Sequence, residues 1–135
     1  MRVIVVDGQG GGIGKQIVSA LKKRYPEQYI TAVGPNSLAT SAMLKAGADV
    51  AATGENPVIV CSHKADVIVG PVGIVIADAL LGEITAAMAT AVGRSQAKRI
   101  LVPVNHCDNY IVGVTDLSMT KLVDGVVTEV GKLIG

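Results

Sequence analysis

The chain has 135 residues, with 12 Lys and Arg against 11 Asp and Glu, which gives a formal net charge of +1. Half of the residues are apolar, yet the aromatic residues are only three tyrosines, with no Trp or Phe. A near-neutral charge gives no general attraction to nucleic acid or to an anionic membrane. A chain without aromatic platforms is also poorly suited to stack single-stranded bases. We therefore expect no nucleic-acid partner and no membrane partner.

The length predicts one domain over residues 1–135, with a core of aliphatic side chains. Runs rich in Val and Ile are typical of parallel strands that are buried on both faces. The two cysteines, Cys61 and Cys107, form no C-x-x-C pair, so the sequence predicts neither a redox dithiol nor a metal site. We find no pattern of a signal peptide or a membrane span, and we expect a cytoplasmic protein.

Strand and helix patterns alternate along the first half of the chain. Apolar runs and amphipathic stretches predict strands at 2–7, 29–34 and 49–54, and helices at 14–25, 37–47 and 57–64. Pro26 ends the first helix, and Ser37 can cap the second. For the third helix, Asn56 is the expected N-cap and Pro57 the expected first position.

The alternation continues in the second half. We predict strands at 66–71 and 99–104, a further strand at 110–116, a helical segment at 73–95 that is interrupted near Gly82, and a closing helix at 119–134. Such alternation with short connections indicates an α/β fold: a doubly wound, mostly parallel sheet in a Rossmann-like three-layer sandwich. We prefer the strand order 3-2-1-4-5, with any sixth strand at the far edge, and the flavodoxin-like order is the alternative.

The loop between the first strand and the first helix has five glycines in the seven positions 8–14. Residues without side chains at a helix start leave backbone amides open to an anion, and the helix dipole adds to the attraction. A tight turn with positive φ would explain one or two glycines only. We therefore predict that a phosphate group is bound by Gly8, Gln9, Gly10, Gly11, Gly12, Ile13, Gly14 and Lys15.

The spacing of these glycines separates three types of phosphate loop. The fingerprint G-x-G-x-x-G does not occur in any register. The P-loop pattern is approached, but Gln9 replaces its first glycine and Gln16 its Ser or Thr, which disfavours a Mg²⁺-dependent ATPase. The pattern G-x-x-x-G-x-G is present as Gly8, Gly12 and Gly14, and it is similar to the cofactor loop of short-chain dehydrogenases.

This resemblance implies NAD(P) as a cofactor, but the rest of the chain departs from that family. No tyrosine is followed four residues later by a lysine, as the dehydrogenase family requires. The end of the second strand, VGPNS, has no acid for a ribose hydroxyl and no arginine for a 2′-phosphate, so Asn36 or Ser37 would have to contact a ribose. The cofactor is therefore left open between NAD(P) and another nucleotide.

A second resemblance covers nearly the whole chain. The segments VDGQGGGIGKQIV, TSAMLKAGAD, TGEN, ADVIVGPVGI and LLGEIT resemble a family of short bacterial proteins of unknown function. This resemblance implies a single Rossmann-like domain and supplies no activity.

Two further strand ends could complete a site, because ligands of open α/β sheets lie beyond the carboxyl ends of the strands where the winding reverses. The fourth strand ends at Gly70, Pro71 and Gly73, where we expect a second helix N-terminus facing the glycine loop, although a plain turn explains these residues equally well. The fifth strand ends in PVNHCDN, where Asn105 could hydrogen-bond a base or sugar.

The same polar segment contains the only candidates for catalysis. His106 could act as an acid or base, because an imidazole titrates near pH ~6.5, and Cys107 could act as a nucleophile if its pKa is lowered. A polar turn with a half-buried thiol is the alternative interpretation. Adjacent residues on an extended segment point to opposite sides, so we do not assume that His106 and Cys107 form a catalytic pair.

Three hypotheses follow for the function. The first is a module that binds a nucleotide or another phosphate-bearing small molecule. The second is a small NAD(P)-dependent reductase or nucleotide-modifying enzyme that uses His106 or Cys107. The third is an assembly protein with a structural glycine turn. The apolar stretch 74–81 and the closing helix offer more apolar surface than one sheet face needs, so a homodimer is also expected.

Overall fold

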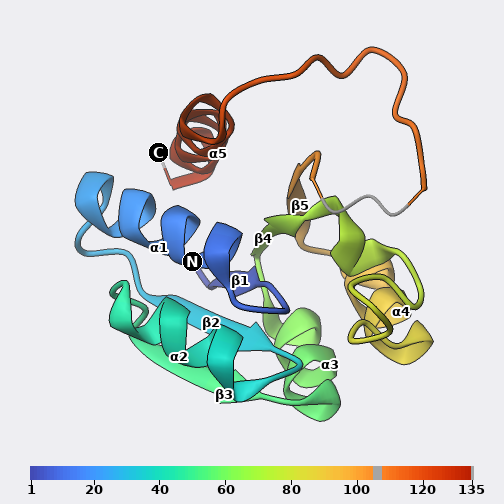
Figure 1. Cartoon of the computed structure of the whole chain (residues 1–135). Helices are drawn as coiled ribbons and strands as arrows, with labels where there is room; N and C mark the ends of the chain where they lie inside the picture. The colour runs from blue at the N-terminus through green and yellow to red at the C-terminus, as the bar shows by residue number, and fades with distance from the viewer. Residues whose placement is uncertain (105–107, 135) are drawn as a thin grey trace.

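A parallel sheet of five strands organises residues 1–104 and 108–134, the part of the chain that the computed structural model describes (Figure 1). The strands are β1 (Val3–Val6), β2 (Ile30–Gly34), β3 (Val50–Thr53), β4 (Val67–Pro71) and β5 (Lys98–Val102). Their order is β3-β2-β1-β4-β5, and every pair is parallel. The predicted order 3-2-1-4-5 is confirmed, and the flavodoxin-like order is excluded. The winding therefore reverses between β1 and β4.

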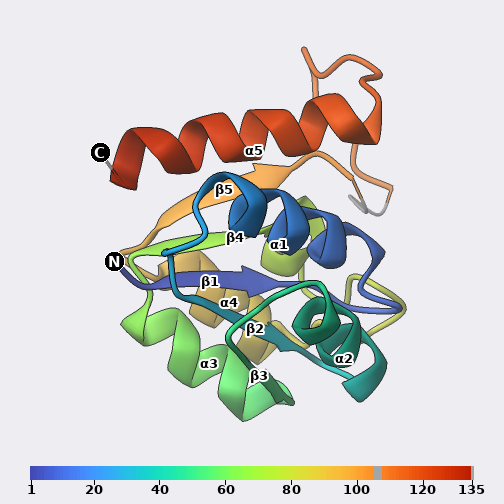
Figure 2. The same cartoon turned by 90° about the vertical axis from the view of Figure 1, so that its left-hand side faces the viewer.

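Helices cover both faces of the sheet (Figure 2). One face carries α1 (Gly12–Arg24), α2 (Ser37–Lys45) and α5 (Met119–Ile134). The other face carries α3 (Glu55–Lys64), the 3₁₀ turn η1 (Val72–Val75) and α4 (Ala86–Arg94). The predicted α/β class and the doubly wound three-layer arrangement are confirmed, and the arrangement is consistent with a Rossmann-like fold. Within residues 1–104 and 108–134, no helix has the length and apolarity needed to cross a membrane.

The central strand β1 shows why the strands read as unbroken apolar runs. Successive side chains of a strand point to opposite faces. Val3 and Val5 accordingly join the core under α1, α2 and α5, while Ile4 and Val6 join the core under α3 and α4. All four are buried, as expected for a strand between two helical layers.

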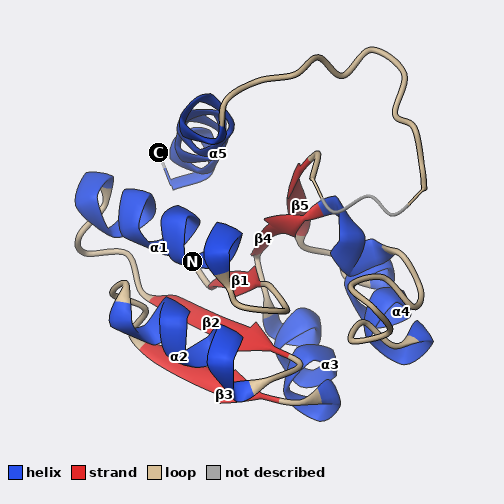
Figure 3. Cartoon of the chain, in the orientation of Figure 1, coloured by secondary structure: helices blue, strands red, loops and turns tan. Residues whose placement is uncertain are grey.

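The segment after β4 differs from the predicted helix at 73–95. The chain forms only the four-residue η1, then a loop over residues 76–85, and α4 begins after Thr85 (Figure 3). In this loop Leu80 and Leu81 both have φ of 57° and Asp78 has φ of 64°. L-residues in the left-handed region cannot continue a right-handed helix. The stretch 74–81 is thus not a helix with a spare apolar face, since Leu80 is buried against the sheet layer.

Two predicted helix starts are also shifted. Asn36, not Ser37, caps α2, and its side chain accepts a hydrogen bond from the Ala39 N–H at 2.8 Å. Helix α3 begins at Glu55, so Asn56 lies inside the helix and is not its cap. Gly54, with φ of 126°, provides the turn that precedes α3.

The predicted strand at 110–116 is absent, and this segment pairs with no strand of the described sheet. It belongs to an exposed stretch that arches away from the body between β5 and α5 (Figure 1). Gly113, with φ of 88°, bends it. The closing helix predicted at 119–134 is confirmed as α5.

Candidate functional site: the glycine loop

The glycine loop between β1 and α1 is held from the inside by the carboxylate of Asp7. This side chain is 2% exposed. Its Oδ1 accepts the N–H of Gly8 at 2.8 Å, and its Oδ2 accepts the N–H of Gly14 at 2.7 Å. A carboxylate in this position satisfies donors that a helix start leaves unpaired and complements the helix dipole. The amides of Gly8 and Gly14, which are among the predicted phosphate donors, are therefore already used by the protein.

Burial raises the pKa of Asp7 above its ordinary value of 3.8. The hydrogen bonds from Gly14 and Gly8 act against this effect, and the nearby negative charge of Glu83 acts with it. Two carboxylates thus lie close together beneath the loop. Sequence reasoning missed the role of Asp7, although an aspartate that ends a buried strand and directly precedes a glycine loop is a readable signal.

A second carboxylate reaches the loop from residues 76–85. Oε1 of Glu83 accepts the N–H of Gln9 at 2.6 Å and the side-chain N–H of Asn36 at 2.9 Å. Leu80 packs against the same loop, since a Cβ added to Gly8 would lie 2.7 Å from its Cδ1. Glu83 thus contacts the glycine loop, whereas Thr85 caps α4 by accepting the Met88 N–H. Loop 76–85 therefore covers the inner side of the glycine loop.

The helix N-terminus that is predicted to follow β4 and to face the glycine loop is not formed. Gly70 and Pro71 are buried at the end of β4, and Gly73 is buried in η1. A Cβ at Gly70 would meet the carbonyl oxygen of Val6, so close strand packing accounts for this glycine. No helix N-terminus of useful length follows, because η1 has four residues. The prediction of a second helix N-terminus at this strand end is therefore wrong, and the alternative of a plain turn accounts for these residues.

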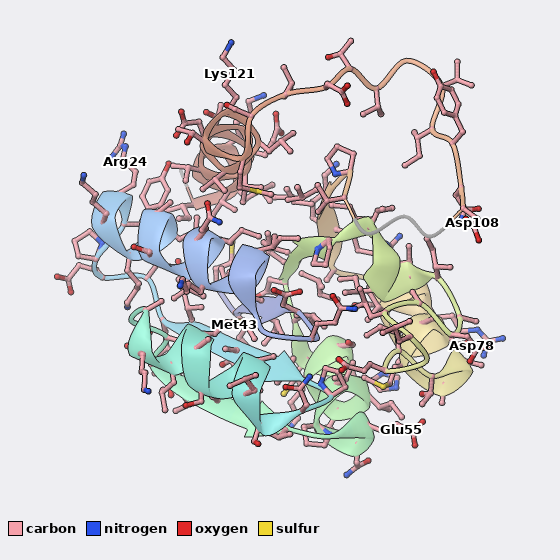
Figure 4. All side chains as sticks on the ribbon, in the orientation of Figure 1. Arg24, Met43, Glu55, Asp78, Asp108 and Lys121 are labelled. Atoms are coloured by element: carbon pink, nitrogen blue, oxygen red, sulfur yellow. The ribbon has the colours of Figure 1, made fainter. Side chains whose placement is uncertain are left out.

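The five glycines of the loop fall into two groups. Packing explains three of them: a Cβ at Gly8 would meet Leu80, one at Gly11 would lie 2.7 Å from the carbonyl oxygen of Ala39, and one at Gly14 would meet Met43 and Asp7. Met43 is labelled in Figure 4, between α1 and α2. Gly11 also has φ of 72°.

The second group, Gly10 and Gly12, has no such explanation. An added Cβ at either position would meet nothing within 4 Å, and neither residue is in the left-handed region. Both are exposed. Nothing in the packing of the described residues therefore requires a glycine at these two positions.

The hydrogen bonds of the loop divide in the same way. The N–H of Gly11 donates to the carbonyl of Gly8 at 3.0 Å, and the N–H of Lys15 donates to the carbonyl of Gly11 at 2.8 Å. The amide of Ile13 points toward Asp7 and lowers the pKa of that carboxyl slightly. Within the part of the chain that the structure describes, the amides of Gly10 and Gly12 have no acceptor. The exposed side chain of Lys15 follows on the first turn of α1.

The remaining predicted site residues contribute less. Asn36 is occupied at both ends of its amide, by Ala39 and by Glu83. Asn105, His106 and Cys107 lie outside the described residues. Across residues 1–104 and 108–134, no cluster of three or more His, Cys, Asp or Glu side chains could hold a metal ion.

The comparison with known families covers almost the whole chain. Residues 2–135 match the model of a family described as Domain of unknown function (DUF3842). The chain belongs to this family. No curated protein and no solved structure matches it. The description of DUF3842 assigns no activity, so the function of this DUF3842 protein has to be inferred from its own residues.

Proposed function

We propose that this protein binds a nucleotide or another phosphate-bearing small molecule at the outer edge of the glycine loop. The phosphate contacts are the amides of Gly10 and Gly12 and the ammonium group of Lys15. One observation carries the proposal: among the described residues, the amides of these two glycines have no acceptor, the space beside them is open, and no packing contact requires a glycine there.

The chemistry of a phosphate explains this pairing of free amides and missing side chains. A phosphate oxygen needs donors within about 3 Å, and the absence of side chains at Gly10 and Gly12 leaves open space for the anion to approach their amides. Gly12 is the first residue of the 13-residue α1, where the helix dipole favours negative charge. The rest of the ligand would extend along the carboxyl edge of the sheet, where the strand order reverses.

The competing interpretations explain less. A purely structural turn accounts for Gly8, Gly11 and Gly14 but gives no reason for Gly10 and Gly12. A reductase or a nucleotide-modifying enzyme would depend on His106 and Cys107, whose geometry is outside the described residues. We therefore propose no reaction, and NAD(P) and other nucleotides are the candidate ligands.

Thermal unfolding with NAD(H), NADP(H), ATP, GTP, flavins and pyrophosphate tests the proposal. A ligand present at about 100 times its Kd stabilises by about 2.7 kcal/mol, which corresponds to a rise in Tm of roughly 5–10 °C in a chain of this size. The variant Gly12→Asp should stay folded and lose the shift, because its carboxylate would occupy the place of the phosphate.

Ala86→Asp is the matched control. Ala86 is also an exposed first residue of a helix, α4, so the control adds the same charge at an equivalent helix position. It should keep the ligand-induced shift. The proposal is wrong if none of the compounds raises the Tm, or if Gly12→Asp retains the full shift.

A further inference from the structure

An open trough of about 760 Å³ lies over the outer surface of α1, between α2 and the first turns of α5. Its floor is mainly apolar and includes Ala20, Ala42 and Val123. Three lysines line it, namely Lys15, Lys23 and Lys45, against the single carboxylate of Asp124 among the described lining residues. The trough is therefore apolar at its base and positively charged at its rim.

The segment before α5 carries the opposite charge to the trough. Residues 108–118, here called the arm, arch away from the sheet before α5 begins (Figures 1 and 2). Tyr110 is 84% exposed and Val112 is 86% exposed. The arm contains Asp108 and Asp116, and the sequence has no Lys or Arg between Arg99 and Lys121. The arm is thus rich in apolar residues and negatively charged, and the side chains of Tyr110 and Val112 are in solvent.

We propose that the arm of one copy lies in the trough of a second copy, and that the exchange is reciprocal. The two surfaces are both apolar in part and carry opposite charges, which favours this pairing over contact with another lysine-rich surface. Exposed aromatic side chains such as Tyr110 are typical anchors at the centre of an interface. The trough accepts such an anchor on its apolar floor.

The dimensions and the position of the two parts agree with a two-fold exchange. The trough follows α1 from Lys15 to Lys23, roughly 12 Å at the rise of an α-helix. An extended arm of 11 residues reaches roughly 35 Å, so about a third of it fills the trough. The arm leads directly into α5, whose Thr120 and Val123 line the trough. The arm and the trough thus adjoin at the start of α5, and the two-fold axis of the proposed exchange would pass beside it.

Reversal of charge on each side separately provides the test. The trough variant carries Lys23→Glu and Lys45→Glu, and the arm variant carries Asp108→Lys and Asp116→Lys. All four side chains are exposed, so the fold should be kept. Sedimentation equilibrium should give a dimer for the wild type, and the dissociation constant of each variant should rise about tenfold or more.

An equimolar mixture of the two variants should restore the dimer. In the mixture, the acidic arm of the trough variant meets a basic trough, and the basic arm of the arm variant meets an acidic trough. The double variant Tyr110→Ser, Val112→Ser should also weaken the dimer while leaving the Tm of the monomer unchanged, because these side chains bury little surface within one copy. Lys15 is left intact in every variant, so phosphate binding at the glycine loop is read independently.

Each other result overturns the inference. A wild-type chain that stays monomeric up to about 1 mM has no such exchange. A dimer that both charge variants retain uses a different interface. If the mixture does not associate more strongly than either variant alone, the arm and the trough are not partners.

Discussion

Replacement of Asp7 by Ala should destabilise the fold by several kcal/mol, because this one side chain satisfies two buried amides. The N–H groups of Gly8 and Gly14 donate to its carboxylate at 2.8 and 2.7 Å, and both glycines are buried. A buried donor without an acceptor costs about 1–3 kcal/mol, so two cost roughly 2–6 kcal/mol. The substitution also removes a charge that burial disfavours, which offsets part of the lost free energy of unfolding. We therefore expect the free energy of unfolding to fall by about 2–4 kcal/mol. A typical domain has only about 5–15 kcal/mol of stability.

Urea unfolding followed by far-UV circular dichroism measures this loss, since the chain has no Trp. Asp7→Asn should lose less than Asp7→Ala, because its amide oxygen still accepts one of the two N–H groups. If Asp7→Ala lies within about 0.5 kcal/mol of the wild type, the carboxylate does not hold the loop and the site geometry is wrong.

The raised pKa of Asp7 adds a dependence on pH with a definite sign. A carboxyl whose folded-state pKa is raised binds its proton more tightly in the folded state than in the unfolded chain. The folded state is therefore penalised as pH rises above the ordinary value of 3.8 and through the raised pKa. The stability difference between wild type and Asp7→Asn should accordingly widen as pH is lowered from neutral toward that value.

Three further predictions concern Glu83, Leu81 and Asp49. Glu83→Gln keeps an oxygen for Gln9 and should cost less than about 0.5 kcal/mol, while Glu83→Ala should cost about 1 kcal/mol and speed hydrogen exchange at the Gln9 amide. Leu81 is 96% exposed with φ of 57°, so Leu81→Gly should raise the unfolding free energy by about 0.5–1 kcal/mol in urea titrations. Leu38→Gly, in the right-handed first turn of α2, should lower it by about 1 kcal/mol. Asp49 accepts hydrogen bonds from the Ile30 N–H and from the Lys22 ammonium group, and these bonds hold its pKa below the ordinary 3.8. The stabilisation of the fold by the Asp49 carboxylate is therefore present above pH 3.8 and is lost as the pH falls through the lowered pKa. In an acid titration of unfolding free energy, Asp49→Asn should not show this loss.

The strands and their order were predictable because apolar runs and turn residues alternate cleanly in the sequence. The central strands β1 and β4 are buried on both faces, so their apolar pattern depends little on which helix covers them. The stretch 73–85 was not predictable in this way. Its Ala and Leu residues favour a helix locally, but Leu80 packs at Gly8 and Glu83 bonds Gln9. These contacts join parts of the chain far apart in sequence, and they override local propensity.

The site was only half predictable for a similar reason. The glycine-rich spacing indicated the loop, but not which glycines pack and which face solvent. That distinction depends on Ala39, Met43 and Leu80, which approach Gly11, Gly14 and Gly8 only in the folded chain. Asp7 was visible in the sequence, yet its carboxylate competes for the same amides that a phosphate would use.

The charges around the loop limit how a phosphate can be attracted. The N-terminus of α1 carries the equivalent of about half a positive charge, and Lys15 adds one more. Asp7 and Glu83 lie on the inner side of the loop and oppose both when they are ionised. The long-range attraction is therefore small, and the free amides of Gly10 and Gly12 act only at hydrogen-bond distance. Inorganic phosphate should consequently bind weakly, and most of the affinity for a complete ligand has to come from contacts made by the rest of that ligand along the sheet edge.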